Sequence, residues 1–253
     1  MADILDIDKK LKNEMLSIIK NNKREVNEET ERAIEQLLEL SKGSSDISEI
    51  LNWLEDKRRN CQIQTEETGL KGLDKWNIDQ NTGVVSHDTG KFFSLIGVKV
   101  KGADSREVSS WTQPIMKQQE CGILGILAKK INGIRHYLLY AKYEPGNIHK
   151  LQLSPTLQAT ESNLTLAHGG KKPRFAEYFE NGGKGKIITS VVSSEDGGRF
   201  YLKTNRNMII EVPEDEKLDF PDEYIWVNSA QFKKLLKVDG AINSLVRSII
   251  GSA

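Results

Sequence analysis

The sequence predicts an α+β protein, in which a helical N-terminal arm precedes a mixed, mainly antiparallel sheet domain flanked by helices. Three observations predict this class. Residues 1–60 carry apolar side chains at helical spacing, short β-rich runs with turn signals begin near residue 84, and helical spacing returns after Pro221. We therefore expect a helical arm at residues 1–45 and one copy of a sheet domain at residues 46–253.

Two apolar stripes predict the helices of the arm, and a third predicts the helix that follows it. The residues of the first two stripes are Leu11, Met15, Ile18 and Ile19, then Ile34, Leu37, Leu38 and Ser41. The segment "SKGSSD" breaks the pattern, and Asp46 with Glu49 resembles a capping box for a helix through Leu54. Near the C-terminus, Ser229 is expected to cap a helix that stops at Gly240.

Strands are predicted in three regions. "KFFSLIGVKV" (91–100) is short, β-rich and bounded by glycines. "GILGILAKKINGIRHYLLYAKYE" (122–144) predicts a hairpin, because Asn132-Gly133 supplies a turn with positive φ between two apolar runs. Residues 186–212 predict two or three strands, with turns at Asp196-Gly197 and at 205–207.

The composition describes an ordinary globular protein. Of 253 residues, 38% are apolar, and Lys+Arg and Asp+Glu number 36 each, so no net field attracts nucleic acid or an anionic membrane. The charged start lacks the apolar core of a signal peptide, and no run is long enough to span a bilayer. We expect a cytoplasmic protein in which Cys61 and Cys121 are free thiols.

Several kinds of chemistry lack a motif. The sequence has no dinucleotide-binding glycine fingerprint after a strand and no Walker phosphate loop. Its four histidines and two cysteines show no zinc spacing, and no serine lies in a Gly-x-Ser-x-Gly elbow. We therefore expect no cofactor and no metal site, and acid–base work by side chains instead.

Three segments are polar where the surrounding pattern predicts burial or a short turn: residues 109–120, 142–163 and 193–208. They combine aromatic, amide, hydroxyl, carboxylate and basic side chains. A nucleotide sugar needs such a mixture, because its base, pyrophosphate and hexose are bound by different groups. The alternative is that the amides cap turns and the charges are solvated.

Six motifs of the sequence resemble those of the NDP-hexose 2,3-dehydratases. They are "WTQPI", "GILGIL", "AKYEPGN", "QLSPTLQATESN", "SSEDGGRF" and "NRNM", in the order found in that family, and the resemblance covers residues 46–240. It implies a Nudix-like fold without the Nudix catalytic box. It also implies removal of the C2 hydroxyl of an NDP-4-keto-6-deoxyhexose, usually dTDP-linked, to give a 3,4-diketo sugar for a separate NADPH-dependent 3-ketoreductase. Familiar members carry two tandem copies of the domain, so we expect a homodimer of this single copy.

The resemblance also implies roles for particular residues. Glu195, Glu144 and His168 are the candidates for acid and base, because both glutamates stand at strand ends before tight turns. Trp111 is expected to stack on the base or to lie in the core. The remaining candidates for substrate binding are Gln113, Lys142, Asn147, Gln152, Ser154, Gln158, Asn163, Lys203, Arg206 and Asn207. The competing function is a catalytically inactive Nudix-like module that binds a nucleotide sugar.

Overall fold

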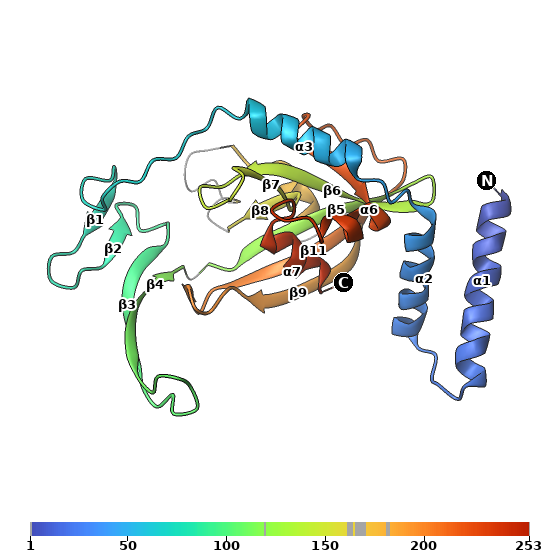
Figure 1. Ribbon diagram of the computed structural model, residues 1–253, viewed down its shortest axis with the longest axis horizontal. Helices are drawn as coiled ribbons and strands as arrows, with labels where there is room; N and C mark the ends of the chain where they lie inside the picture. The colour runs from blue at the N-terminus through green and yellow to red at the C-terminus, as the bar shows by residue number, and fades with distance from the viewer. Residues whose placement is uncertain (1, 119, 161–163, 165–170, 181–182, 253) are drawn as a thin grey trace. The chain divides into compact units, whose positions relative to one another are not determined.

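The structure, a computed structural model, describes residues 2–118, 120–160, 164, 171–180 and 183–252 (Figure 1). It has helices and mixed sheets, which confirms the α+β class and the helical N-terminal arm. The chain forms two compact units. Unit one comprises Met1–Asn60, Ala128–Leu153 and Pro213–Asn243, and unit two comprises Cys61–Leu127, Ser154–Val212 and Ser244–Ala253.

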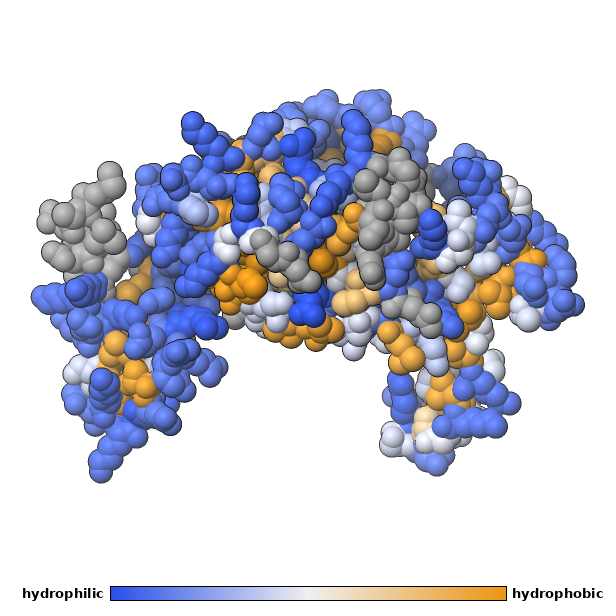
Figure 2. All heavy atoms as spheres, turned by 180° about the vertical axis from the view of Figure 1, so that it is seen from behind, coloured by the Kyte–Doolittle hydropathy of each residue, from blue (hydrophilic) through white to orange (hydrophobic). Residues whose placement is uncertain are grey.

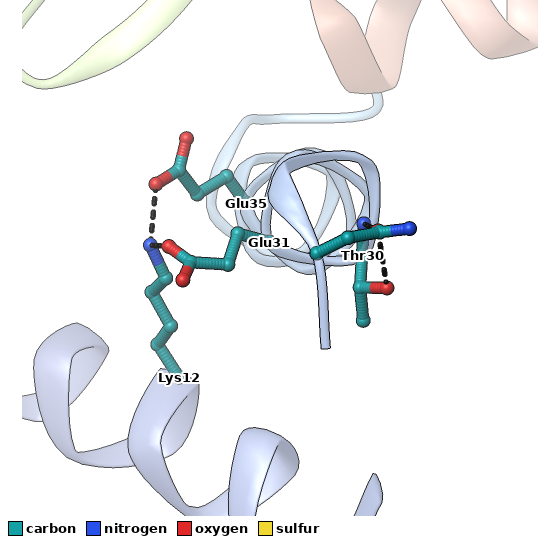
Figure 3. A network of polar contacts seen from close by, with 5 residues as sticks. Lys12, Thr30, Glu31 and Glu35 are labelled. Carbon is teal, nitrogen blue, oxygen red and sulfur yellow. Dashed lines mark hydrogen bonds and ion pairs between the residues drawn. The ribbon is translucent and has the colours of Figure 1, made fainter. Parts of the chain in front are cut away.

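Unit one contains the three helices predicted at the N-terminus and one more near the C-terminus: α1 (Ala2–Asn21), α2 (Glu28–Lys42), α3 (Ser48–Asn60) and α6 (Ser229–Leu235). The Asn27 side chain caps α2 by accepting a hydrogen bond from the Thr30 N–H, 2.9 Å away. Lys12 on α1 pairs with Glu31 and Glu35 on α2, at 3.0 and 2.7 Å (Figure 3). Exposed ion pairs contribute at most about 1 kcal/mol each, so they hold α1 against α2 weakly.

The strands of unit one are β6 (Ile134–Tyr143), β12 (Tyr224–Asn228), most of β7 (Leu151–Ser154) and the end of β5 (Gly122–Ile131). Their order is β12-β6-β5, with β7 beside β6. Asn132 and Gly133 have φ of 53° and 75°, which confirms the predicted hairpin. β12 runs antiparallel to β6, from Tyr224 opposite Tyr140 to Asn228 opposite His136. The fully buried side chains of this unit include Leu54, Leu138, Leu139, Val227 and Leu235.

The predicted cap of α6 is wrong by one residue. Asn228, not Ser229, is the N-cap, and it forms a reciprocal capping box with Gln231. Asn228 Oδ1 accepts from the Gln231 N–H at 2.9 Å, and Asn228 Nδ2 donates to the Ser44 carbonyl at 3.1 Å. Both residue types favour caps, but only Asn228 has a glutamine three residues on to complete a capping box, and its contact with Ser44 adds to this.

Unit two contains two groups of strands. One is a five-stranded sheet in the order β1-β2-β3-β4-β10, in which β10 is parallel to β4 and the other neighbours are antiparallel. Its strands are β1 (Trp76–Ile78), β2 (Val85–His87), β3 (Ser94–Val100), β4 (Trp111–Lys117) and β10 (Phe200–Tyr201). The polar segment 109–120 thus supplies strand β4. A strand can carry its polar residues because alternate residues at the start of β4 face away from the core.

The second group of unit two has the order β5-β11-β9, with β8 paired to β5. Its further elements are β8 (Leu157–Ala159), α5 (Ala176–Phe179), β9 (Lys186–Ser194), β11 (Thr204–Val212) and α7 (Ser244–Ile250). Both short helices pack against β11. β9 and β11 are antiparallel, with Thr204 opposite Ser194 at one end and a register shift after Ile209.

The predicted turn at residues 205–207 is wrong, because Asn205 and Asn207 lie within β11. The chain turns earlier, where Leu202 has φ of 54°. Asparagines usually mark turns since their side chains bond the local backbone. Here both amides are buried and bond side chains from other elements, so the strand continues through them.

Figure 2 shows hydrophilic side chains over most of the face it presents, with hydrophobic side chains in separate patches. Among the described helices, none has both the length and the apolar character that a membrane crossing needs. Cys61 and Cys121 carry free thiols, as expected. Three apolar residues of β9 are exposed: Ile187, Val191 and Val192.

Candidate functional site

A polar cluster lies on one face of the β9–β11 pair, at the end where β11 begins. Asn205 is opposite Ser193 and Asn207 is opposite Val191, so the side chains of these four residues point to the same side. Just beyond the two strands, the Glu195 N–H donates to the Lys203 carbonyl at 3.0 Å, which continues the pairing. We call Glu195, Lys203, Asn205, Asn207 and Ser193 the polar face.

Hydrogen bonds tie the polar face together. Asn205 Nδ2 donates to Glu195 Oε1. Asn207 Nδ2 donates to Ser193 Oγ at 2.7 Å and to Ser248 Oγ of α7 at 3.1 Å. Asn207 is 1% exposed, and its Oδ1 is buried without a hydrogen-bond partner in the described part of the chain. A buried acceptor without a donor is rare in proteins, and it suits a site that receives a ligand hydroxyl.

The ammonium group of Lys203 is part of this cluster. The residue is 5% exposed, and its Nζ donates to the carbonyl of Glu120. Burial lowers the pKa of Lys203, and the neighbouring Glu120, Cys121 and Glu195 oppose that shift. A buried amine near a carboxylate with which it can exchange protons is typical of acid–base sites.

Gly122 gives the polar face room. A Cβ at this position would lie 2.4 Å from Asn205 Oδ1. Only glycine therefore allows β5 to approach the Asn205 amide that holds Glu195.

Trp111 forms a second feature of unit two. Its Nε1 donates to Gln113 Oε1 at 2.7 Å, and Gln113 Nε2 donates to the Gly198 carbonyl at 2.9 Å. The Arg106 guanidinium lies 5.3 Å from the Trp111 ring centroid. An open cavity of about 200 Å³ is lined by Arg106, Glu107, Val108 and Trp111. Trp111 is half-buried, so its ring can serve as an aromatic wall for a ligand.

Three of the site residues predicted in unit one, Lys142, Glu144 and Asn147, form hydrogen bonds or ion pairs in the turn that follows β6. Lys142 Nζ pairs with Glu144 Oε1 at 3.2 Å, and Asn243 Nδ2 donates to Glu144 Oε2 at 2.9 Å. Asn147 Nδ2 donates to the carbonyls of Lys142 and Lys150, at 3.3 and 3.1 Å. These contacts fix the turn after β6, and they place the Glu144 carboxylate between a cation and a buried amide.

The other predicted residues are more scattered. Gln152 and Ser154 lie on β7 and Gln158 lies on β8, with Ser154 fully buried. Arg206 alternates with Asn205 and Asn207, so it is exposed on the opposite side of β11, where its Nη1 donates to Ser190 Oγ at 3.3 Å. Asn163 and His168 lie outside the described residues.

The sequence reasoning missed Asn205 and Ser193 on the polar face and Ser248 on α7. A signal for Asn205 was present, because polar residues recur at every second position in Lys203, Asn205 and Asn207. The contribution of Ser248 depends on the packing of α7 against β11, which no local pattern reveals.

Comparison with known proteins decides the family. Residues 47–252 match the family model described as NDP-hexose 2,3-dehydratase. The chain belongs to this family. The NDP-hexose 2,3-dehydratase resemblance of the six motifs is thereby confirmed.

Curated relatives carry one name. The chain is 39% identical over 221 residues to the dTDP-4-dehydro-6-deoxy-alpha-D-glucopyranose 2,3-dehydratase of Saccharopolyspora spinosa, covering 87% of this chain and 45% of that protein. It is 39% identical over 202 residues to the enzyme of the same name from Amycolatopsis orientalis, covering 78% and 42%. The chain thus spans about half the length of the curated relatives it matches.

Solved structures with some likeness include an ADP compounds hydrolase, with a TM-score of 0.39 and 17% identity over 72% of this chain and 97% of that one. A second is the Ap4A hydrolase of C. elegans, with a TM-score of 0.31 and 13% identity over 53% and 98%.

Proposed function

We propose that this chain catalyses the 2,3-dehydration of an NDP-4-keto-6-deoxyhexose, with dTDP-4-dehydro-6-deoxyglucose as the best candidate substrate. The observation that carries the proposal is the match of residues 47–252 to the 2,3-dehydratase family. The names of the curated relatives, at 36–39% identity, support the dTDP-linked substrate. The polar face supplies a carboxylate, an amine and an open acceptor in one place.

The reaction needs a base first. The 4-ketone acidifies the proton on C3, and Glu195 is proposed to remove it, giving an enolate whose charge rests on the C4 oxygen. The enolate then expels the C2 hydroxyl, and the resulting enol relaxes to a 3,4-diketo sugar. No electrons leave the substrate, so the step consumes no redox cofactor.

The residues proposed to bind the substrate are described for one unit at a time. In unit two, Trp111 and Gln113 suit the base, and Asn207 Oδ1 suits a hydroxyl of the sugar. In unit one, Lys142 and Gln152 are the proposed donors to phosphate or sugar oxygens. Asn163, His168, Ser154, Gln158 and Arg206 remain proposed site residues.

Incubation of the purified protein with dTDP-4-dehydro-6-deoxyglucose tests the function. We expect a product lighter by one water, trapped as a diol or reduced by an added NADPH-dependent 3-ketoreductase, and detected by mass spectrometry. We expect the same rate after EDTA treatment and without added NAD, because side chains carry the proton transfers. Binding without consumption would instead support the nucleotide-sugar-binding module, and a loss of activity with EDTA that a divalent metal restores would contradict the side-chain mechanism.

We also propose that the protein forms a homodimer, and that its product passes to a separate 3-ketoreductase. A contact between copies is supported by β9, which is the edge strand of its sheet and carries three exposed apolar residues, Ile187, Val191 and Val192. A stable interface of this kind should bury on the order of 2,000 Å². Sedimentation at micromolar concentration is expected to give twice the mass of the chain, and a fully active monomer would contradict the proposal.

A further inference from the structure

A buried lysine requires an explanation. Removing an ammonium group from water costs several kcal/mol unless strong partners compensate. Lys203 is 5% exposed, and its Nζ donates to a neutral acceptor, the backbone carbonyl of Glu120. The nearby Glu120 and Glu195 offset the cost of burial only in part, because the pKa of Lys203 is still lowered. If Lys203 served only to satisfy the Glu120 carbonyl, a neutral donor would be sufficient. The buried charge is explained better if it acts on a ligand beside Glu195.

The position of Lys203 relative to Glu195 is fixed by the backbone. The Glu195 N–H bonds the Lys203 carbonyl at 3.0 Å, and Asn205, two residues along, holds Glu195 Oε1. The two residues thus stand opposite each other at the end of the β9–β11 pair, where residues 196–202 join the strands. A carboxylate and an ammonium placed in this way can act on neighbouring carbons of one sugar ring.

We propose that Lys203 is a catalytic residue, whose ammonium group protonates the C2 hydroxyl as it leaves. This assignment rests on the proposed dehydratase function and on Glu195 as the base. Hydroxide is a poor leaving group, so the proton must arrive as the C2–O bond breaks. The lowered pKa of Lys203, caused by burial, makes its ammonium a stronger acid than an exposed one.

The step balances in atoms and charge. The Glu195 carboxylate takes the C3 proton, and the electron pair of that C–H bond forms the C3–C4 double bond of the enolate. As the enolate collapses, a C2–C3 double bond forms, the C2–O bond breaks, and the departing oxygen takes a proton from Lys203 to become water. The neutral carboxyl of Glu195 then protonates C2, while the Lys203 amine takes the proton of the C3 hydroxyl. This gives the 3,4-diketone and restores both residues.

The roles of Lys203 and Glu195 can be separated by measuring two half-reactions, exchange of the C3 proton and loss of water. In D2O, removal and return of the C3 proton exchanges it for deuterium without loss of water. Lys203→Met should keep this exchange, measured by NMR on dTDP-4-dehydro-6-deoxyglucose, and should lose water at least about 10²-fold more slowly than the wild type. Glu195→Gln should lose the exchange itself.

Lys129→Met is the matched control. Lys129 Nζ likewise donates to a backbone carbonyl, that of Glu216 at 2.9 Å, but it lies in unit one and outside the polar face. This variant is expected to keep both exchange and dehydration. Lys203→Gln is the second variant, because its amide can still donate to the Glu120 carbonyl while it has no proton of ammonium acidity to give. If Lys203→Met does not fold, Lys203→Gln takes its place, and it is expected to keep the exchange and to lose the dehydration.

The outcomes are distinct. Dehydration within about threefold of the wild type in Lys203→Gln would show that the lysine is a structural cap and would overturn the assignment. Loss of exchange together with dehydration, in a variant that still binds dTDP and melts like the wild type, would also overturn it. If the wild type itself loses no water from the substrate, the proposed function fails and the assignment falls with it.

Discussion

Replacing Glu195 with glutamine is expected to lower kcat by about 10²–10⁴-fold and to leave the affinity for the nucleotide sugar nearly unchanged. Glutamine has the size of glutamate, and its amide oxygen can still accept from Asn205 Nδ2. The polar face should therefore keep its geometry while it loses the group that takes the C3 proton. Steady-state kinetics with dTDP-4-dehydro-6-deoxyglucose and calorimetric titration with dTDP measure the two effects separately.

Glu144→Gln is the matched comparison, because Glu144 is also a carboxylate that follows a strand. The sequence predicts a loss in the same range for it. A Glu144→Gln variant that keeps kcat would leave Glu144 as the residue that holds Lys142 and Asn243. Near-normal turnover of Glu195→Gln would contradict the assignment of the base. Loss of binding with kcat intact would make Glu195 a substrate clamp, and His168 would be the next residue to test.

Local signals predicted most of the elements. The Asn132-Gly133 hairpin and the three N-terminal helices follow from turn chemistry and apolar spacing, which act within a few residues. The errors arise where partners are distant in the sequence. Asn205 and Asn207 look like turn residues until Glu195, Ser193 and α7 supply their hydrogen bonds.

The candidate site was predicted less completely, for the same physical reason. An amide in the sequence can serve a ligand or the chain itself, and only the fold decides which. Asn147 stays a predicted substrate ligand, and its Nδ2 also donates to two carbonyls of its own turn. Glu195 was predicted from a family motif and Lys203 from the polar segment 193–208. Asn205, which holds Glu195, was missed because its partner lies just beyond the neighbouring strand β9.

Gly125 illustrates a requirement that the apolar run "GILGIL" hides. It lies on β5 opposite Leu157 of β8, and a Cβ there would lie 2.2 Å from the ring of Phe179. Phe179 belongs to α5 and is 3% exposed, so it has little room to move. The glycine is therefore needed for the close packing of α5. It is not needed for the backbone conformation, since its φ is not positive.

Gly125→Ala is accordingly expected to destabilise the protein by about 1–3 kcal/mol, because overpacking forces a buried ring off its rotamer. This corresponds to a fall in Tm of about 2–4 °C for each kcal/mol in a chain of this size, measured by calorimetry. Gly97→Ala on β3 is the control, since nothing lies within 4 Å of a Cβ there and we expect no loss. Phe179→Leu in the Gly125→Ala background should restore part of the lost stability by removing ring atoms from the clash. Equal melting of Gly125→Ala and wild type would contradict the packing of Phe179 over Gly125, because no other side chain lies closer to that position.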